Sequence, residues 1–289
     1  MIKRFAAENE IKIQEAQYLY LLEDFAKLIA TSDVRENIIF KGGFIISHVV
    51  GIENRKTRDL DIVSSEIDLS KEEQVRNMFI DICGNSQKNL SFFDYEFKNI
   101  KKAQSQKKGN AYEVMISARK NSLLFNLKID LAENAFIFPS AVRFGYKSSF
   151  DDEVIEVLSY PIENILAEKF ETSLDRGEFN TRIRDFVDMQ MIFKGNSNLI
   201  DKKKLAHTIL EVSCDRGTEM NLLNYDRLTS DIFDSPVFKE NFNNYMRKNE
   251  KMNATLESCK QAMNDIYKIM DDQGIIRELA NMKNKVQIR

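Results

Sequence analysis

The chain has 289 residues, 43% hydrophobic and 30% charged, and its 42 basic and 45 acidic side chains give a net charge of −3. This composition excludes wholesale disorder and a strongly basic nucleic-acid coat, and the length predicts roughly two domains. We expect no membrane span, because no apolar run approaches ~20 residues, and no secretory signal. Three widely spaced cysteines form no metal or redox motif and fit reduced thiols in the cytoplasm.

Scarce residue types narrow the chemistry further. The only histidines are His48 and His207, far apart in the sequence, so a multi-histidine zinc site is excluded. The common glycine-rich phosphate-binding motifs of nucleotide-binding proteins are absent as well. Carboxylates and lysines remain plentiful. For an enzyme, this favours catalysis by a metal ion that aspartates hold.

The first part of the chain mixes helices and strands. Apolar spacing predicts a helix over the first ~30 residues, a short strand at 38–40, a glycine turn and a helix at 44–50. A strand follows at 59–63. We expect a helix over 70–83, with Ser70 as its N-cap and Glu73 completing a capping box. Further strands are predicted at 91–98, 111–118, 123–131 and 153–159.

Beyond Pro161 the chain is predicted to be mostly helical, with helices from Pro161 to Gly177 and over 181–194, 201–216, 235–249 and 254–272. We therefore expect an α+β protein, with a mixed sheet flanked by helices in residues 1–160 and a helical domain in 161–289. Proline and glycine are too rare for a long flexible linker, so the two parts are expected to pack together.

Two aspartates two residues apart are the first candidate site. Asp59 and Asp61 stand in an apolar strand, so both side chains project from one face, with Cα atoms about 6.6 Å apart. Such a pair can converge on a divalent ion, which relieves the repulsion between the two carboxylates. The alternative is an exposed strand face with two solvated acids.

Two other features supply what a triphosphate site needs beside carboxylates. Gly42 and Gly43, between a strand and a helix, let backbone N–H groups approach an anion at the helix N-terminus. Asp130 shares a face with Lys128, and if its strand lies beside residues 59–63 it completes an acidic triad for Mg²⁺. The alternatives are a plain tight turn and a solvated strand position.

The helical part carries a second group of charges. Lys169 falls inside the apolar stripe of its helix, so it requires an anion or must extend its amine to the surface. Asp185 and Asp188 share a face of a helix that is apolar on nearly every side, and buried carboxylates need a cationic partner. Both observations also fit an internal salt bridge.

Three blocks of this sequence resemble the AbiEii/AbiGii-type toxins of the nucleotidyltransferase superfamily, which has the DNA polymerase β-like fold. The blocks are Lys41-Gly42-Gly43 followed by residues 55–61, then 160–169, then 181–188, and they lie between 38 and 193. The resemblance implies a nucleotidyltransferase-like sheet and a Mg²⁺-dependent nucleotidyl transfer from an NTP to a hydroxyl. A tRNA 3′ end, a role in phage defence and a neighbouring antitoxin are implied in the same way.

The resemblance also implies roles for residues. Asp59, Asp61 and Asp130 hold the metals, Gly42, Gly43 and Lys169 bind phosphates in a cleft between the domains, and Asp185 is a catalytic aspartate or positions the lysine. Phe44 stands where many members have Ser or Thr, so the hydroxyl contact is lost or comes from Ser47. Transfer to a protein or small molecule, and a nucleotide-binding scaffold without turnover, stay open as alternatives.

Overall fold

The computed structural model describes residues 1–52, 54–64, 67–88, 91–103, 109–133, 136–249 and 252–287. The chain divides into two compact units, which are described separately below. The sheet unit comprises Met1–Ala135 and Ala141–Tyr160. The helical unit comprises Phe136–Ser140 and Pro161–Arg289.

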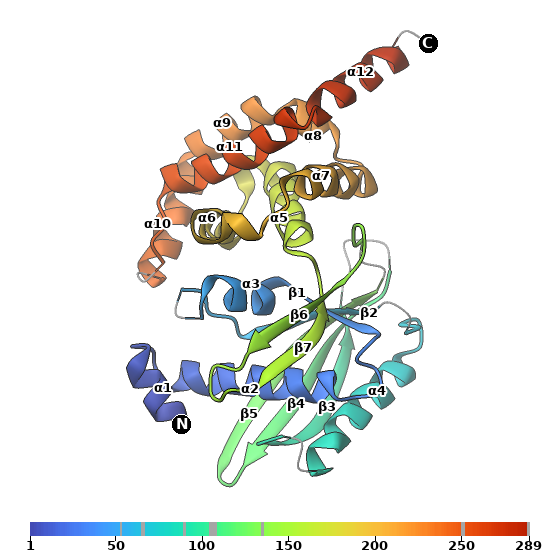
Figure 1. Ribbon diagram of the computed structural model, residues 1–289, viewed down its shortest axis with the longest axis vertical. Coiled ribbons are helices and arrows are strands. Elements are labelled where there is room, and N and C mark those ends of the chain that lie inside the picture. Colours follow the sequence, from blue (N-terminus) through green and yellow to red (C-terminus); the bar gives the residue numbers. More distant parts are fainter. Residues whose placement is uncertain are drawn as a thin grey trace. The chain divides into compact units, whose positions relative to one another are not determined.

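The sheet unit is built on a mixed sheet of seven strands in the order β3-β4-β5-β2-β1-β7-β6 (Figure 1). The strands are β1 (Ile38–Lys41), β2 (Asp59–Ser64), β3 (Asp94–Lys102), β4 (Ala111–Lys120), β5 (Leu123–Glu133), β6 (Val142–Lys147) and β7 (Val154–Ser159). The pairs β2/β5 and β1/β7 are parallel, and the remaining neighbours are antiparallel. The α+β class and the mixed sheet that the sequence predicts are confirmed.

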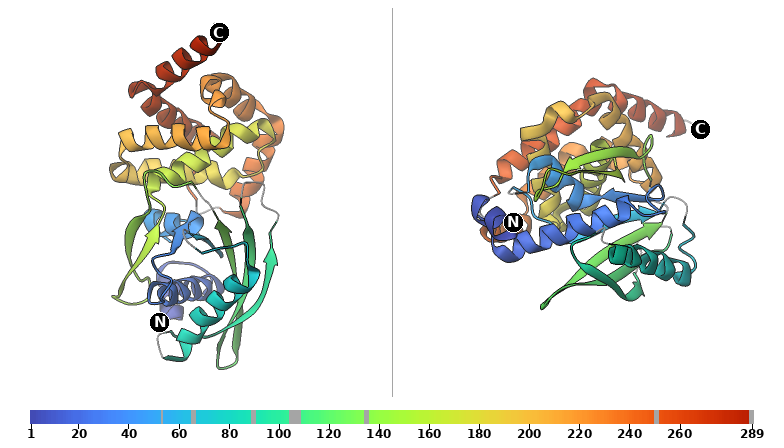
Figure 2. Two further views of the ribbon diagram at one scale, coloured as in Figure 1. Left: turned by 90° about the vertical axis from the view of Figure 1, so that its right-hand side faces the viewer. Right: turned by 60° about the horizontal axis from the view of Figure 1, so that its bottom comes forward.

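One face of this sheet is apolar and covered by helices. Leu60, Ile62 and Ile129 are fully buried there, as the alternation along β2 and β5 requires. The helices α2 (Ile13–Ala30) and α4 (Glu72–Gly84) lie along this face (Figure 2), and α3 (Gly42–Val50) packs against β1 and β2. The opposite face of the central strands therefore presents their polar residues.

The structure corrects three sequence-based expectations in this unit. The N-terminal helix is two helices, α1 (Ile2–Glu8) and α2, and Glu10 between them has a left-handed φ of 50°. Helix α4 starts after Lys71 instead of Ser70, because the Ser70 hydroxyl donates to Asp68 and caps nothing. Strand β6 was not expected, and it pairs with β7.

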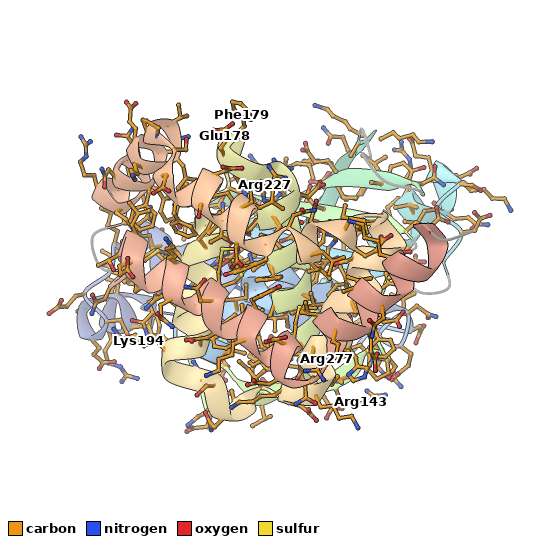
Figure 3. All side chains as sticks on the ribbon, turned by 90° about the horizontal axis from the view of Figure 1, so that it is seen from above. Arg143, Glu178, Phe179, Lys194, Arg227 and Arg277 are labelled. Carbon is orange, nitrogen blue, oxygen red and sulfur yellow. The ribbon has the colours of Figure 1, made fainter. Side chains whose placement is uncertain are left out.

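The helical unit consists of α5 (Ile162–Arg176), α6 (Ile183–Asn196), α7 (Lys202–Arg216), α8 (Met220–Leu223), α9 (Tyr225–Asp234), α10 (Pro236–Lys248), α11 (Leu256–Asp272) and α12 (Ile275–Gln287). Helix α5 packs against α6 and α7, and α11 packs against α6 and α7 as well. Apolar stripes face inward, whereas Lys194, Arg227 and Arg277 are exposed on the outside (Figure 3). None of the helices in the described ranges is both long and apolar enough to cross a bilayer.

Candidate active site

A row of charged residues crosses the polar face of the sheet. Asp61 on β2 is paired with Lys41 on β1 and with Asp130 on β5, and Asp130 is paired with Glu113 on β4. Residues paired across neighbouring strands project from the same face of a sheet. The strands that carry Asp61 and Asp130 are therefore neighbours, which is the condition that the sequence analysis set for an acidic triad, and four residues from four strands form one row.

A second row lies one pleat further along the same face. Asp59 on β2 is paired with Lys128 on β5. The Lys128 Nζ lies 3.1 Å from Oδ2 of Asp130 and 3.5 Å from Oε2 of Glu113. We call Asp59, Asp61, Glu113 and Asp130 the acidic face. The lysine is thus drawn in among carboxylates that the fold places side by side.

The electrostatics of Asp130 reflect this crowding. Burial raises the pKa of the Asp130 carboxyl, and the salt bridge to Lys128 works in the opposite direction. The negative charges of Asp61 and Asp59 raise it further, so the net pKa of Asp130 lies above its usual range. Like charges held together in this way are stabilised by any cation that binds among them.

The donor set of the acidic face fits a hard divalent cation, since Mg²⁺ prefers carboxylate oxygens and keeps several waters. In the arrangement that the described residues adopt, however, no three Asp, Glu, His or Cys side chains stand close enough together to hold a metal ion. The carboxylates surround the Lys128 ammonium instead. A metal site here therefore requires rearrangement of side chains, while the backbone already places Asp61 beside Asp130.

The glycines stand directly beside the carboxylates. We call Lys41, Gly42 and Gly43 the glycine turn. Gly42 has a left-handed φ of 64°, and a Cβ at this position would overlap Oδ2 of Asp61. Only glycine satisfies both the conformation and the space. The predicted glycine turn and the predicted metal ligand Asp61 are thus brought together.

The second glycine is packed against the loop that precedes β2. A Cβ at Gly43 would lie 2.7 Å from both Nη1 of Arg55 and Oγ1 of Thr57. Arg55 is 1% exposed, and its Nη1 donates to the carbonyl of Lys56 at 2.6 Å. This buried guanidinium holds the loop against the start of α3. Gly43 is therefore required for packing, and the loop sets where β2 begins.

The glycine turn also has the groups that bind anions. Helix α3 starts at Gly42, so the first backbone N–H groups of the helix have no acceptor within it, and the helix dipole favours negative charge there. Lys41 is the N-cap residue, and its Nζ lies 5.8 Å from the centre of the Tyr160 ring. A phosphate at this turn would meet backbone donors and an ammonium group.

Two residues of α3 do not reach the glycine turn. The Ser47 hydroxyl is buried and donates to the carbonyl of Phe44 at 2.7 Å, three residues back in the same helix. Phe44 is fully buried and packs against the rings of Phe40 and His48. The Ser47 hydroxyl is therefore engaged within its own helix, and the Phe44 side chain packs in the core.

The helical unit gathers its predicted charged residues within hydrogen-bond distance. The Lys169 Nζ lies 2.6 Å from Oδ1 of Asp185 and 2.8 Å from Oδ2 of Asp188, and Arg182 Nε lies 2.7 Å from Oδ2 of Asp185. We call these four residues the Lys169 cluster. The lysine and both aspartates are almost completely buried, whereas Arg182 is exposed. Helix α5 supplies the lysine and α6 both carboxylates.

The charges in this cluster stabilise one another. Burial alone would lower the pKa of Lys169, but the carboxylates of Asp188 and Asp185 outweigh it and hold that pKa above its usual range. Burial alone would raise the pKa of Asp185, but Lys169 and Arg182 outweigh it and keep that pKa below its usual range. The pKa shifts of Lys169 and Asp185 therefore both favour the charged forms of these two groups.

Sequence reasoning missed Glu113 and the contacts of Lys128 and Arg55. Alternation along 111–118 does place Glu113 among polar positions, so a signal was present. Its significance depends on β4 lying next to β5, which the local pattern does not reveal. Arg55 lies within a matched motif, but nothing local indicates that it is buried against Gly43.

Comparisons with known proteins agree with this arrangement. A model of the family described as "Nucleotidyl transferase AbiEii toxin, Type IV TA system" matches residues 25–268. The solved structure of a candidate nucleotidyltransferase from Helicobacter pylori is similar, with a TM-score of 0.50 and 15% identity over 93% of this chain and 99% of that chain. A search of the curated proteins gave no match.

Two more distant solved structures were also found. The protein JHP933 from Helicobacter pylori has a TM-score of 0.47 and 16% identity, over 95% of this chain and 98% of that chain. An antigenic nucleotidyltransferase-like protein from Paracoccidioides brasiliensis has a TM-score of 0.36 and 15% identity, over 68% and 92%.

The family match covers most of both units, and it includes the glycine turn, the acidic face and the Lys169 cluster. The structure with a TM-score of 0.50 supports the nucleotidyltransferase-like fold. The resemblance that the sequence motifs indicate is thereby confirmed. The chain belongs to the AbiEii family of nucleotidyl transferase toxins of type IV toxin–antitoxin systems.

Proposed function

We propose that this toxin transfers a nucleotide from an NTP to the 3′ end of a tRNA, with Mg²⁺ held by Asp59, Asp61 and Asp130. The observation that carries the proposal is the pairing of Asp61 with Asp130 next to the glycine turn. Carboxylates for a metal and backbone donors for phosphates thus come from adjacent segments. A metal–triphosphate complex needs carboxylates for its metal and donors for its phosphates side by side.

The nucleotide is bound through its phosphates at the glycine turn. The N–H groups at the start of α3 donate to phosphate oxygens, and Lys41 contributes an ammonium on the same side of the sheet as Asp61. Gly42 lets the chain pass close to the Asp61 carboxylate, so the phosphates and the metal ligands share one location. Phe44 and Ser47 take no part, because both are buried in the core.

In the reaction, the oxygen of the acceptor hydroxyl attacks the α-phosphorus. A new P–O bond forms, the bond to the β-phosphate oxygen breaks, pyrophosphate leaves, and the hydroxyl proton passes to a carboxylate of the acidic face. Bound Mg²⁺ supplies positive charge that stabilises the phosphoryl oxygens and the leaving group. Asp59, Asp61 and Asp130 would hold this metal.

We also propose that Lys169 of the helical unit takes part in the transfer as a phosphate-binding residue. Its contacts with Asp185 and Asp188 support a fixed orientation for the amine. Asp185 already accepts from Lys169 and Arg182, which favours a positioning role over that of a general base. A charged group that is already held in place lowers the reaction barrier more, because it need not reorganise during the reaction.

The biological setting is part of the proposal. Membership of the family implies an antitoxin partner and an NTP substrate. We propose that the toxin acts in the cytoplasm, where NTPs and tRNA meet, and that it serves phage defence through abortive infection. Support for an RNA acceptor comes from exposed lysines on β3, of which Lys101 is paired with Glu113 of the acidic face. Lys107 and Lys108, which follow β3 in the sequence, lie outside the described residues.

The test is an incubation of purified protein with Mg²⁺, each of the four α-labelled NTPs, and separate pools of tRNA and protein. We expect label at the 3′ end of tRNA with at least one NTP. Asp59→Asn should abolish the transfer. Asp94→Asn, which removes an exposed carboxylate from β3 in the same sheet, is the matched control and should retain it.

Other outcomes separate the alternatives. If label appears only in the protein pool, the acceptor is a protein and not tRNA. Growth arrest that persists in Asp59→Asn, with no labelled product from any pool, supports a nucleotide-binding scaffold and contradicts the proposal. Circular dichroism of both variants ensures that a lost activity reflects the missing carboxylate.

A further inference from the structure

Lys128 occupies the centre of the acidic face. Its Nζ contacts Asp130 at 3.1 Å and Glu113 at 3.5 Å, and its backbone position is paired with Asp59. Carboxylates from β4 and β5 therefore contact one ammonium group, and Asp59 of β2 stands at the neighbouring register position. Strand alternation explains why it is there, since Lys128 and Asp130 stand two residues apart on β5 and project from the same side.

The two partners of this lysine differ in what they do. Asp130 is one of the proposed metal ligands, and it has Asp61 as its neighbour on one side. Glu113 is its neighbour on the other side, away from Asp61. The Lys128 side chain is 36% exposed, so its flexible stem is free to move between them. It can release Asp130 and keep Glu113.

We propose that Lys128 is the resident counter-ion of the acidic face, and that a divalent cation must displace it from Asp130 onto Glu113. This inference rests on the proposed function. The ammonium and the metal require the same carboxylate oxygens, and they repel each other at close range. Lys128 thereby weakens binding of free metal and balances the charge of the face when no metal is bound. It acts as a positioning residue and does not touch substrate.

The experiment is a Mn²⁺ titration of the full-length protein, with free Mn²⁺ followed by electron paramagnetic resonance. Lys128→Met should tighten Mn²⁺ binding by on the order of tenfold, because a positive charge beside the metal is removed. Lys128→Arg keeps the charge, and its affinity should stay near that of the wild type. Lys98→Met is the matched control, since Lys98 pairs with Glu96 on β3 and lies at the surface.

Glu113→Gln provides a second measurement. It removes the acceptor for the displaced ammonium, so Mn²⁺ binding should weaken by about threefold or more, and combination with Lys128→Met should abolish that effect. Circular dichroism and a thermal melt of each variant confirm that it is folded.

The outcomes separate this inference from the proposed function. Unchanged or weaker Mn²⁺ binding in Lys128→Met overturns the inference, whereas the proposed function stands if the wild type binds Mn²⁺ and Asp61→Asn does not. Binding that appears only in Lys128→Met supports the inference. Absence of Mn²⁺ binding from the wild type and from Lys128→Met overturns both.

Discussion

Replacing Lys169 by methionine removes the ammonium that contacts two nearly inaccessible carboxylates, with exposed fractions of 4% for Asp185 and 0% for Asp188. Removing one partner from a buried ion pair typically costs about 3–5 kcal/mol. We therefore expect Lys169→Met to reduce the free energy of unfolding of the helical unit by that amount, which corresponds to a fall in Tm of roughly 10–15 °C.

The assay is scanning calorimetry of the full chain at several pH values. The pKa of Asp185 is lowered in the folded protein, so its stabilisation is complete above the pKa of the unfolded chain and is lost as pH falls through the folded pKa. The pKa of Lys169 is raised, so its stabilisation is complete below its unfolded pKa and is lost as pH rises through the folded pKa. In Lys169→Met the free energy of unfolding should therefore depend less on pH at both the acidic and the alkaline end.

Two further variants sharpen the result. Lys169→Met combined with Asp188→Asn removes a charge from each side and should recover most of the lost stability. Lys194→Met, an exposed position on α6, should change the stability by less than about 0.5 kcal/mol. A Tm for Lys169→Met equal to that of the wild type would refute the reasoning. The prediction also means that loss of toxicity in a Lys169 variant proves a role in transfer only if the variant is still folded.

Three further predictions concern the glycine turn and helix α3. Gly42→Ala should lower the free energy of unfolding by about 1–2 kcal/mol because of its left-handed backbone alone, and it should abolish transfer because the new Cβ pushes the Asp61 carboxylate aside. Thermal melts and transfer assays measure the two effects. Gly84→Ala is the control, since a Cβ there meets nothing within 4 Å. Lys41→Met should weaken NTP binding by about tenfold or more in a fluorescence titration, and unchanged affinity would remove Lys41 from the phosphate site. Ser47→Ala should leave transfer rates as they are, and a large loss would restore Ser47 as a ligand.

The acidic face shows how far local patterns reach. Alternation within one strand is local, so the common face of Asp59 and Asp61 follows from the sequence. The pairing of Asp61 with Asp130 depends on two strands far apart in the chain adopting one register, which was expected only on condition that the strands are neighbours. The contact of Lys128 with Glu113 requires a third strand and lay beyond sequence reasoning.

Hydrogen-bond partners that lie close in the sequence explain why Ser70 and Ser47 are engaged elsewhere than the sequence indicates. Ser70 fits a capping box, but its hydroxyl finds the Asp68 carboxylate first, and α4 begins later. Ser47 finds a carbonyl within its own helix. In β6 the apolar residues Val142, Phe144 and Tyr146 alternate as in a half-exposed strand, so a signal was present and was overlooked, and the strand pairs with β7.

The Lys169 cluster lies between these cases. A lysine within an apolar stripe and two aspartates on a buried face each indicate that a partner of opposite charge is needed, and this follows from the cost of burying charge. Lys169 and the two aspartates become one another's partners because α5 packs against α6. The sequence thus indicates the need for a partner, and packing selects it.

The central claim is that the carboxylates of the acidic face hold the metal next to phosphates at the glycine turn. Crystals grown with Mn²⁺ and a non-hydrolysable NTP analogue test it most directly, through anomalous scattering at the manganese edge. We expect manganese between the carboxylates of Asp61 and Asp130, with phosphate at the first N–H groups of α3 and the Lys128 ammonium on Glu113. Manganese and phosphates elsewhere, with Lys128 still on Asp130, would contradict it.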